Sequence, residues 1–580
     1  MLLATILTSL SFATTAAPQE PTRVMRTVPV GDLAGFELPF HRTPFGSLLR
    51  VEDEGVELID HDVAERGIAG DYLVELVRTS VERMDPEAVD ELVVAVVDSR
   101  LALSGPPAAV DRAVAVIRAL DASVGRPIII EASLVEFRTG FGPLDVRLDR
   151  DALARALDGK RTRWNSRSVT RSGRATVLSQ AKFTQFVYDC DVEVAQDQSI
   201  SDPQVRTMFE GIHLEVEPHA IPDSEDLVLF GHAVLGDRCG DIETRSTGID
   251  AMTALDVPRV ANNQLEFSGR IPNGGALVAC FDGAEDSGSR FALIVSASQP
   301  REDRQVPGMR AFPVSALTSR SLVSSVRARG VRFDHEAHSV FPLRVGEPGG
   351  AMGVDTVYEI LSHVLEPQLD EGQVDILMVA GWALTFGRDD VIETTREALV
   401  AMHDQWIRSA ACDLWAWVDD LDGGAEAAFD GRPDANPNLP AMLHHVRLPV
   451  ILGRPHFVVH GVESTVVHDV GVEIAQEASA VNPIVTSTFG GLFASLVVQD
   501  GIDALSVQCD VDLSQLLRTR RHAAETRHGG DLHLPSTERL RYVHAGPIET
   551  GKVLEFGDGG SITDGARRFR VRQAMRVERR

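Results

Sequence analysis

The sequence lacks several features that would assign it to a simple class. After the extreme N-terminus, no stretch approaches the roughly 18 consecutive apolar residues that a membrane-spanning helix needs. The five cysteines are too few and too scattered for a disulfide framework, and none lies in a CxxC pair of the kind that binds zinc. Lys and Arg number 56 against 85 Asp and Glu, so the formal net charge is -29. Because binding to phosphates needs a basic surface, this balance argues against nucleic acid as the main partner.

Sequence signatures of catalysis are also missing. The chain has no GxSxG nucleophile elbow, no HExxH zinc motif, and neither of the phosphate-binding patterns GxxxxGK[ST] and GxGxxG. Asp419, Asp420 and Asp422 lie beside a Gly-Gly pair and hint at a calcium loop, but Glu426 is too near for EF-hand spacing. A solvated acidic loop is the favoured interpretation of this segment.

A few other polar positions are candidates for function. His444-His445 precedes a predicted strand, and neighbours on a strand point to opposite faces, so these imidazoles are not expected to share one metal. His61-Asp62 is isolated, and Glu193 and Glu473, which recur in the pattern VE[VI]AQ, fit solvent-facing strand positions better than acid–base chemistry. We therefore predict a non-enzymatic protein with no catalytic, cofactor-binding or metal-ligating residues and no cofactor.

The composition that is present is that of an ordinary globular protein. Apolar residues make up 44% and charged residues 24% of the 580 residues, a length that allows roughly three to five domains. Residues 1–17 combine an apolar stretch with small residues before Pro18, the outline of a secretory signal peptide, although no Lys or Arg precedes the apolar stretch. We predict a signal peptide over 1–17 and an exported protein; a buried N-terminal strand or a mis-assigned start codon are the alternatives.

The chain contains an internal repeat. Residues 174–199, RATVLSQAKFTQFVYDCDVEVAQDQS, align without a gap with residues 454–479, RPHFVVHGVESTVVHDVGVEIAQEAS, at an offset of 280. Downstream, Pro258 and Ile271 align with Pro535 and Ile548 at an offset of 277, and upstream 101–104 aligns with 382–385 at 281. This pattern predicts a tandem duplication, with halves over about 71–298 and 351–562.

Each half is expected to begin with an α-β-β-α module. Apolar residues recur with helical spacing in four stretches: Leu73, Leu76, Val77, Val81 and Met84; Val110, Ala113, Val114 and Ile117; Val354, Val357, Leu361 and Val364; and Val391, Thr395, Ala398 and Met402. Strands are predicted between the helices of each pair, over 91–97 and 100–104 and over 376–380 and 383–386. These stripes are expected to form cores, with no functional site.

Beyond its module, each half becomes β-rich. Strands are predicted over Pro127–Phe137, 211–217, 227–230, 264–268 and 276–280. In 211–217 the apolar residues Ile212, Leu214 and Val216 alternate with polar ones, and Asn273-Gly274-Gly275 fits a hairpin turn. The predicted fold class is α+β, β-rich, with two repeated halves.

Four stretches in this order resemble the secretins, which are ring-forming outer-membrane proteins of type II and type III secretion and of type IV pili. Residues 92–120 resemble the ring-building domain, 125–132 (GRPIIIEA) resembles "xQVxIEAxIxEV", 172–179 (SGRATVLS) resembles "GxAxVLSxP" without its Pro, and 211–218 (GIHLEVEP) resembles "GxxLxVxP". The resemblance implies that each half is a ring-building-type module followed by a secretin-core-like β-sheet domain. In chain order, the predicted segments are 1–17 signal peptide, 18–124 module, 125–298 β domain, 299–350 linker, 351–410 second module, and 411–580 second β domain with an Arg-rich C-terminus.

One departure from the family pattern concerns the channel. Secretins carry a "VPxLGxIPxLGxLF" segment after the GG turn, whereas here only 279–290 (ACFDGAEDSGSR) precedes the closing strand. The predicted strands also look short compared with the roughly 9–11 residues that membrane-spanning strands require. We therefore expect a structural protein that lacks an obvious pore-gate segment and does not itself form a pore.

The resemblance implies a protein of the periplasm or outer membrane that is associated with secretion or pilus-type envelope machinery and acts by oligomeric assembly. Its expected partners are further copies of itself or other secretion-system proteins, and the Arg-rich residues 566–580 could contact an acidic surface. The alternative is a soluble monomeric periplasmic or surface binding protein that reuses the duplicated fold. A hydrolase on an all-β scaffold is a third, less favoured possibility.

Overall fold

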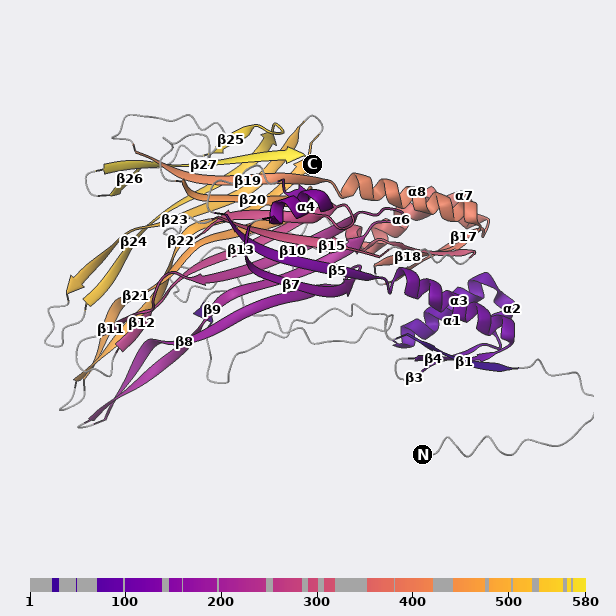
Figure 1. Ribbon diagram of the computed structural model, residues 1–580, viewed down its shortest axis with the longest axis horizontal. Coiled ribbons are helices and arrows are strands. Elements are labelled where there is room, and N and C mark those ends of the chain that lie inside the picture. Colours follow the sequence, from indigo (N-terminus) through magenta and orange to yellow (C-terminus); the bar gives the residue numbers. More distant parts are fainter. Residues whose placement is uncertain are drawn as a thin grey trace, which may run out of the picture.

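The fold is known from a computed structural model of the chain. It describes residues 23–30, 48–49, 70–97, 100–137, 145–158, 160–195, 198–246, 254–283, 290–300, 307–318, 352–379, 381–420, 442–474, 479–501, 504–523, 531–556, 561–564 and 567–579. The expected signal peptide, His61-Asp62 and Asp422 lie outside these residues, as does most of the expected linker. The described chain is β-rich, as predicted, and has short α/β modules at one end and long strands at the other (Figure 1).

The first α/β module is a three-stranded antiparallel sheet covered by helices. Its elements are β1 (Val24–Pro29), α1 (Gly70–Met84), α2 (Pro86–Val89), β3 (Val93–Val97), β4 (Arg100–Gly105) and α3 (Pro107–Ser123), with strand order β1-β4-β3. The predicted helical stripes form its core: Leu73 and Val77 of α1 and Val110 of α3 are fully buried together with Leu101 and Leu103 of β4.

The second α/β module has the same kind of sheet, with strand order β16-β18-β17. Its elements are β16 (Met309–Pro313), α5 (Ser315–Thr318), α6 (Val354–Val364), α7 (Glu366–Asp370), β17 (Val374–Val379), β18 (Trp382–Gly387) and α8 (Asp389–Trp406). Strand β16 lies inside the expected linker. Its sequence MRAFPV (309–314) matches MRTVPV (25–30) around β1, so this module begins before the expected boundary at residue 351.

The two modules stack as four layers: sheet, helices, sheet, helices (Figure 1). Helices α1 and α3 lie between the two sheets, because Met309, Leu384 and Phe386 of the second sheet belong to the core of the first module. The opposite face of the second sheet carries Phe312 and Ala383, which pack with α6 and α8. Each module therefore has its own helices, and the helices of the first module also cover the sheet of the second.

The rest of the chain is a sandwich of two large antiparallel sheets. The first, named here the long sheet, contains β2 (Leu48–Leu49), β8 (Thr176–Ala195), β9 (Gln198–Ala220), β10 (Leu227–Arg238), β13 (Arg259–Ile271), β21 (Pro455–Ile474), β22 (Ser479–Asp500), β23 (Leu505–Ala523) and β24 (Asp531–Ile548). Apart from β2, its strands lie in the spatial order β8-β9-β10-β13-β21-β22-β23-β24. The two halves of the chain are therefore joined by the pairing of β13 with β21.

The second large sheet, named here the cover sheet, runs in the order β25-β27-β19-β20-β14-β15-β5-β7. Its strands are β5 (Pro127–Phe137), β6 (Arg147–Leu148), β7 (Arg161–Arg171), β14 (Ala276–Asp282), β15 (Arg290–Ser298), β19 (Ser409–Asp420), β20 (Met442–Ile451), β25 (Val553–Phe556), β26 (Ser561–Asp564) and β27 (Arg567–Arg579). Helix α4 (Arg150–Leu157) and the ribbon β11 (Glu243–Ser246) with β12 (Ala254–Val257) complete the described elements. Leu214 and Leu265 of the long sheet and Ile130 and Leu414 of the cover sheet belong to one buried core.

Two expectations from the sequence are wrong. The strands are not short, because β8, β9, β21, β22, β23 and β24 have 20, 23, 20, 22, 19 and 18 residues. Asn273-Gly274-Gly275 does not close a hairpin, since β13 and β14 lie in different sheets; Gly274 supports this turn with φ +78°. The alternating segment 211–217 lies in β9, where its polar residues His213, Glu215 and Glu217 are buried.

Strand registers in the two halves correspond closely. The β8–β9 pair has a bulge between Val187 and Asp189, and the β21–β22 pair has one between Val467 and Asp469. Likewise, Leu227 pairs with Ile271, and Leu505 pairs with Ile548. Equivalent residues differ by 280 (467 minus 187), by 278 (505 minus 227) and by 277 (548 minus 271), and the first and last values are the offsets read from the sequence.

The upstream offset of 281 needs correction. Leu101 and Leu103 of β4 face the helices of their own module, as Ala383 does in β18. Gly105 and Gly387 end these strands, each close to the carbonyl oxygen of a residue before the neighbouring strand, Glu91 and Gln373 respectively. The offset is therefore 282 (387 minus 105), and a shift of one residue on a strand exchanges its two faces.

The packing of the sandwich predicts the effect of one substitution. A Cβ atom on Gly231 of β10 would lie 2.2 Å from the ring of Phe267, its cross-strand partner in the core. Gly231→Ala should therefore lower the free energy of unfolding by about 1–3 kcal/mol, because the ring must move in a packed interior. Gly546→Ala, in β24 of the same sheet, is the control, since its Cβ would meet nothing nearer than 3.3 Å, in the side chain of His544. Urea titration checks both, and equal stability of the two variants would contradict the packing described.

Candidate functional surfaces

Among the residues that the structure describes, the histidine pair and the two glutamates singled out from the sequence lie in different parts of the fold. His444 and His445 lie within β20 rather than before it, and they point to opposite faces. The ring of His444 meets His460 edge-on at 5.0 Å, whereas His445 stacks on Trp415 at 5.4 Å. Burial lowers the pKa of His444 well below its usual value of 6.5, so it is neutral near pH 7. Glu193 and Glu473 lie near the hairpin ends, where their backbone partners are Ile200 and Ala480.

Metal-ligating side chains are scattered over the described part of the chain. Among the described residues, no group of three or more His, Cys, Asp or Glu side chains is placed to hold a metal ion. Asp419 and Asp420 end β19, and the segment 421–441 that would complete the acidic loop lies outside the described residues. Burial raises the pKa of the Cys280 and Cys509 thiols to about 12, which makes them poor nucleophiles.

The strongest polar cluster surrounds the buried Asp413 of β19. Its carboxylate accepts hydrogen bonds from Arg576 of β27 at 2.9 Å and from His445 of β20 at 3.3 Å, and Arg447 of β20 lies 3.8 Å away. Burial alone would raise the pKa of Asp413, but the His445 hydrogen bond and the two arginine charges hold it below the usual 3.8. A permanently charged carboxylate bonded to both neighbouring strands fixes their register and offers no general acid or base near neutral pH.

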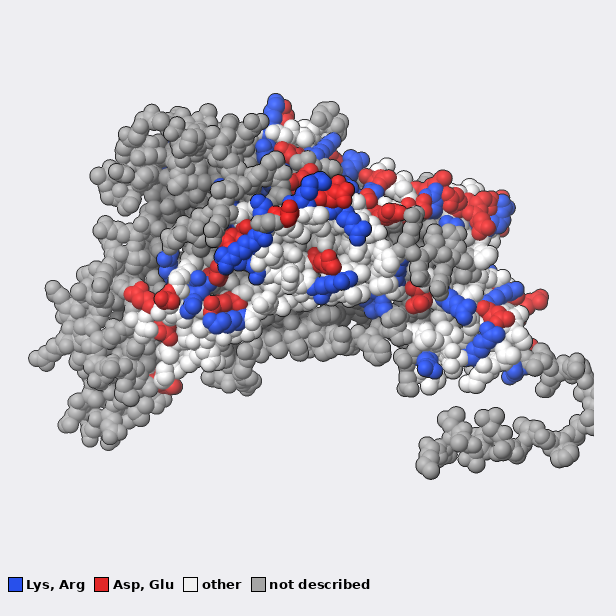
Figure 2. All heavy atoms as spheres, viewed as in Figure 1, with Lys and Arg blue, Asp and Glu red and all other residues white. Residues whose placement is uncertain are grey.

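The Arg-rich C-terminus forms strand β27, and three of its arginines contact this chain's own carboxylates. Arg576 contacts Asp413, Arg572 contacts Glu555, and Arg579 contacts Asp500. Arg572 and Arg576 also lie over the indole rings of Trp417 and Trp415, each at 5.3 Å. On the face shown in Figure 2, acidic and basic side chains are interspersed. The sequence analysis anticipated that the C-terminus contacts an acidic surface. For these three arginines, that surface belongs to the same molecule.

A closed hydrogen-bond circuit lies where the halves and the two large sheets meet. Ser268 of β13 accepts a hydrogen bond from the backbone N–H of Ile451 in β20 at 3.0 Å. Its hydroxyl lies 2.7 Å from Nε2 of His456 in β21, and Nδ1 of that histidine lies 3.0 Å from the carbonyl oxygen of Arg454. Because a carbonyl can only accept, His456 donates from Nδ1. Burial lowers the pKa of His456 to about 3, so the imidazole is neutral near pH 7 and its Nε2 accepts from Ser268.

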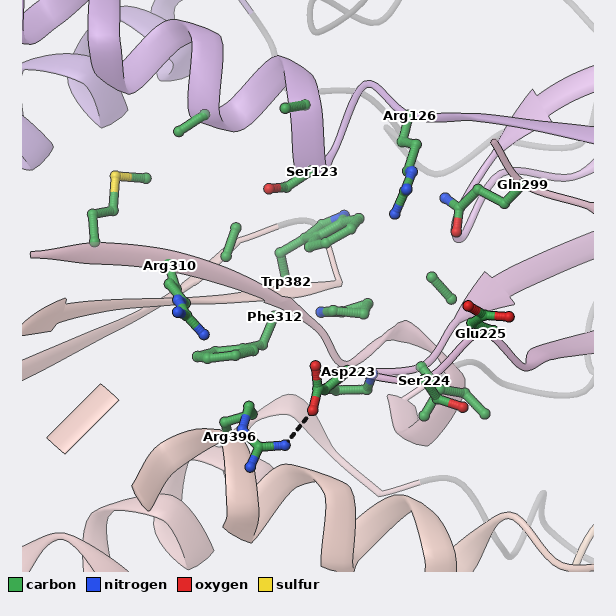
Figure 3. Close-up of a pocket in the computed structure, with 18 of the residues that line it drawn as sticks. Ser123, Arg126, Asp223, Ser224, Glu225, Gln299, Arg310, Phe312, Trp382 and Arg396 are labelled. Carbon is green, nitrogen blue, oxygen red and sulfur yellow. Dashed lines mark hydrogen bonds and ion pairs between the residues drawn. The ribbon is translucent and has the colours of Figure 1, made fainter. Parts of the chain in front are cut away.

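A polar cavity of about 240 Å³ lies where the modules meet the sandwich (Figure 3). Helix α3, the β9–β10 turn, β16 and α8 contribute to its wall. Its charged groups already have partners: Arg396 forms an ion pair with Asp223, and Arg126 donates to the carbonyl oxygen of Pro300 at 2.6 Å. The cavity is therefore lined by paired charges that tie the second module to the β9–β10 turn.

The long sheet ends in two strands that each have one partner. Within the described part of the chain, β8 pairs with β9 alone and β24 pairs with β23 alone. Phe183 of β8 is 51% exposed and Val543 of β24 is 72% exposed. A strand edge of this length presents a row of backbone donors and acceptors that can pair with another strand.

Solved secretin structures are similar to this chain, although no protein-family model and no curated protein sequence matches it. One is the secretin domain of InvG from the Salmonella SPI-1 injectisome, at 11% identity and TM-score 0.23, covering 49% of this chain and 90% of that one. The type IV competence pilus secretin PilQ of V. cholerae is 12% identical with TM-score 0.20, covering 36% and 70%. ExeD of Aeromonas hydrophila is 9% identical with TM-score 0.18, covering 97% and 91%.

Because these identities and scores are low, the function of this chain has to be inferred from its own strands, registers and side chains. Among the described helices, none combines the length and the apolar character that crossing a membrane requires.

The Asp413 cluster predicts a large effect of charge removal. Asp413→Asn should lower the free energy of unfolding by about 3 kcal/mol, because Arg576 and Arg447 would lose their buried carboxylate and keep only the partly exposed Glu578. Asp390→Asn, at an exposed pair with Arg388, should leave stability unchanged. Chemical denaturation of both variants checks the difference. A small effect at Asp413 would mean that the cluster does not determine the register of β19, β20 and β27.

Buried histidines predict acid sensitivity. Burial lowers the pKa of His403 and His460 to about 4 and that of His456 to about 3, whereas an unfolded histidine has 6.5. The unfolded chain therefore binds more protons below pH 6.5, and stability falls as the pH drops from 6.5 toward 4. Each such histidine should cost about 2 kcal/mol at pH 5 relative to pH 8.

Urea unfolding at pH 8 and pH 5 measures this loss, and His456→Gln should make it smaller. His363→Gln is the control, since His363 is exposed. Equal stability of the wild-type chain at both pH values would contradict the neutral state assigned to these histidines.

Proposed function

We propose that this chain is an exported, non-enzymatic, secretin-like structural protein that acts by head-to-tail assembly. Its place would be the periplasm or the outer membrane, as a component associated with protein secretion or pilus-type envelope machinery. The two halves would derive from a tandem duplication. The support comes from the strand registers and from the open edges of the long sheet.

The case for duplication rests on correspondences that extend beyond sequence identity. Gly173 and Gly453, 280 positions apart, both adopt positive φ (+75° and +79°) before the first long strand of their half. Their backbone N–H groups donate to the carbonyl oxygens of Pro218 and Val498, which are also 280 apart. Gly274 and Gly551, 277 apart, share φ +78°. Independent turns would have no reason to repeat both the dihedral angle and the hydrogen-bond partner.

The observation that carries the assembly proposal is the junction between the halves. Inside the chain, 259–265 of β13 pairs with 458–464 of β21. The second-half equivalent of β13 is β24, and the first-half equivalent of β21 is β8; these are the two strands with an open edge. The open edge of β24 therefore corresponds to the β13 side of the internal contact, and the open edge of β8 corresponds to its β21 side. If β24 of one copy pairs with β8 of the next, the contact is heterologous and repeats from copy to copy.

Moving the internal register to the open edges predicts the contact between copies. Adding 277 to residues 259–265 of β13 gives 536–542 of β24, and subtracting 280 from residues 458–464 of β21 gives 178–184 of β8. Residues 536–542 of one copy would therefore pair with 178–184 of the next. This register sets Glu538 opposite Lys182, because Ala261 pairs with Val462 inside the chain. Opposite charges at facing strand positions favour the pairing.

We also propose that the chain does not itself form a pore. The support is the absence after Gly274-Gly275 of a gate-type segment, since β14 ends at Asp282 and β15 begins at Arg290. Strand length gives no support, because the long strands exceed what a membrane crossing needs. A monomeric binding protein is the second candidate, and the polar cavity beside Arg126 and Asp223 is the observation that favours it.

Native mass of the mature chain over a range of concentrations tests the assembly proposal. We expect high-order species that dissociate on dilution, whereas a monomer at all concentrations would favour the binding protein. Lys182→Glu should weaken assembly by about tenfold, because it sets two acidic residues opposite each other. The double variant Lys182→Glu/Glu538→Lys should restore it, and Lys160→Glu, outside the predicted contact, is the control. Assembly unaffected by Lys182→Glu would refute the predicted register.

A further inference from the structure

The sheet of the first α/β module has an exposed apolar face. On the side away from α1 and α3, Met25 is 72% exposed, Val93 57% and Val97 56%. Registers place them together, since Met25 and Val93 both pair with Ser104, and Val97 pairs with Arg100 on the same face. Three exposed apolar side chains on one small sheet face mark a surface that another element could cover.

The equivalent face of the second module is already covered. Met309 corresponds to Met25 in the MRAFPV and MRTVPV strands, and Val379 corresponds to Val97 at an offset of 282. Met309 is 1% exposed and Val379 5%, because this face packs against α1 and α3 of the first module. The chain therefore shows, within itself, what kind of element covers such a sheet face: a pair of helices from a neighbouring module.

The second module in turn has an uncovered helical face. Leu73, Val77 and Val81 of α1 correspond to Val357, Leu361 and Leu365, all of them fully buried, at an offset of 284. At the same offset, Ser80, which is 0% exposed and lies on the side of α1 that carries Arg83, corresponds to Val364, which is 45% exposed. The side of α6 that corresponds to the Ser80 side of α1 thus carries an exposed apolar residue.

We infer that the Val364 side of α6 in one copy docks on the first-module sheet face of a second copy, so that each chain fills two consecutive positions of the assembly. This inference rests on the proposed function. The modules and the long sheet give the same head-to-tail direction. The open helical face and the open strand β24 both belong to the second half, and the open sheet face and the open strand β8 both belong to the first half. An assembly of N chains would then show 2N repeating units, alternately joined within and between chains.

The side chains at the open faces fit this use. The internal contact includes an ion pair between Arg83 of α1 and Asp375 of β17 at 2.6 Å. Asp375 corresponds to Val93 at an offset of 282, and Ser80 corresponds to Val364, so the open faces replace polar positions by apolar ones. Two apolar faces that match a contact already present in the chain favour a second copy of this chain over an unrelated partner.

The test uses two variants of the full mature chain that alter opposite faces. The helix-face variant is Val364→Arg, and the sheet-face variant is Met25→Asp/Val97→Asp. Each should weaken self-association by at least about tenfold, because a charge would have to be desolvated in an apolar contact. Glu359→Arg is the matched control: it adds the same side chain to the same helix, and its equivalent Glu75 stays exposed beside the internal contact. Circular dichroism verifies folding, and a folding defect in one variant leaves the other as the test.

Mixing the two variants gives the sharpest result. Each retains one intact face, so an equimolar mixture should form pairs of chains that neither forms alone, as measured by analytical ultracentrifugation. If the wild-type chain assembles and both variants assemble like Glu359→Arg, or if the mixture gains nothing, the inference is wrong while the strand-edge proposal stands. If the wild-type chain is a monomer throughout, the proposed function itself fails. Electron-microscope images with as many repeating units as chains, instead of twice as many, would also overturn the inference.

Discussion

The pairing of β13 with β21 is the contact on which the rest of the structure depends. It joins the long strands of both halves into one sheet, and the circuit of Ser268, His456 and Ile451 ties this junction to the cover sheet. The two α/β modules also contact each other, since α1 and α3 of the first module cover the sheet of the second module, which contains β16. One relation between the halves thus appears at three levels: long strands, cover-sheet strands and helices.

A contact between non-identical sides of two similar units leaves both outer sides unsatisfied. Here the open sides are β8 and the sheet face with Met25 on one half, and β24 and the helical face with Val364 on the other. Long strand edges and exposed apolar faces are costly for a protein that stays alone in solution, because they invite non-specific pairing. Self-assembly in the same geometry would cover these strand edges and apolar faces with the matching surfaces of other copies.

Local patterns in the sequence predicted much of the modules and strands. The sequence correctly predicted α1, α3 and the strand Pro127–Phe137. Burial of one face spaces the apolar residues of a helix or strand regularly along the sequence, and this spacing can be recognised. Strand length was underestimated, since the alternation that predicts a strand over 211–217 covers only part of β9, whose earlier residues include Asp202 and Pro203 and show no such alternation. Strand β16 was assigned to a linker, because a single five-residue strand carries little periodic signal and its match to β1 is only six residues long. The Asp413 cluster was not anticipated: its members lie far apart in the sequence, and nothing local shows that an acidic strand residue will be buried.

The most direct measurement of the central claim is a cross-link between copies in the predicted register. Two chains, each with Cys190 and Cys239 replaced by Ser, would carry Lys182→Cys and Glu538→Cys respectively and be mixed under mild oxidation. Directly opposite strand residues bring Cβ atoms to roughly 4.5–5.5 Å, close enough for a disulfide after small adjustments. The account predicts a covalent dimer from the mixture and none from either chain alone. Its absence at concentrations where the wild-type chain assembles, or equal cross-linking with Val169→Cys in place of Lys182→Cys, would contradict it.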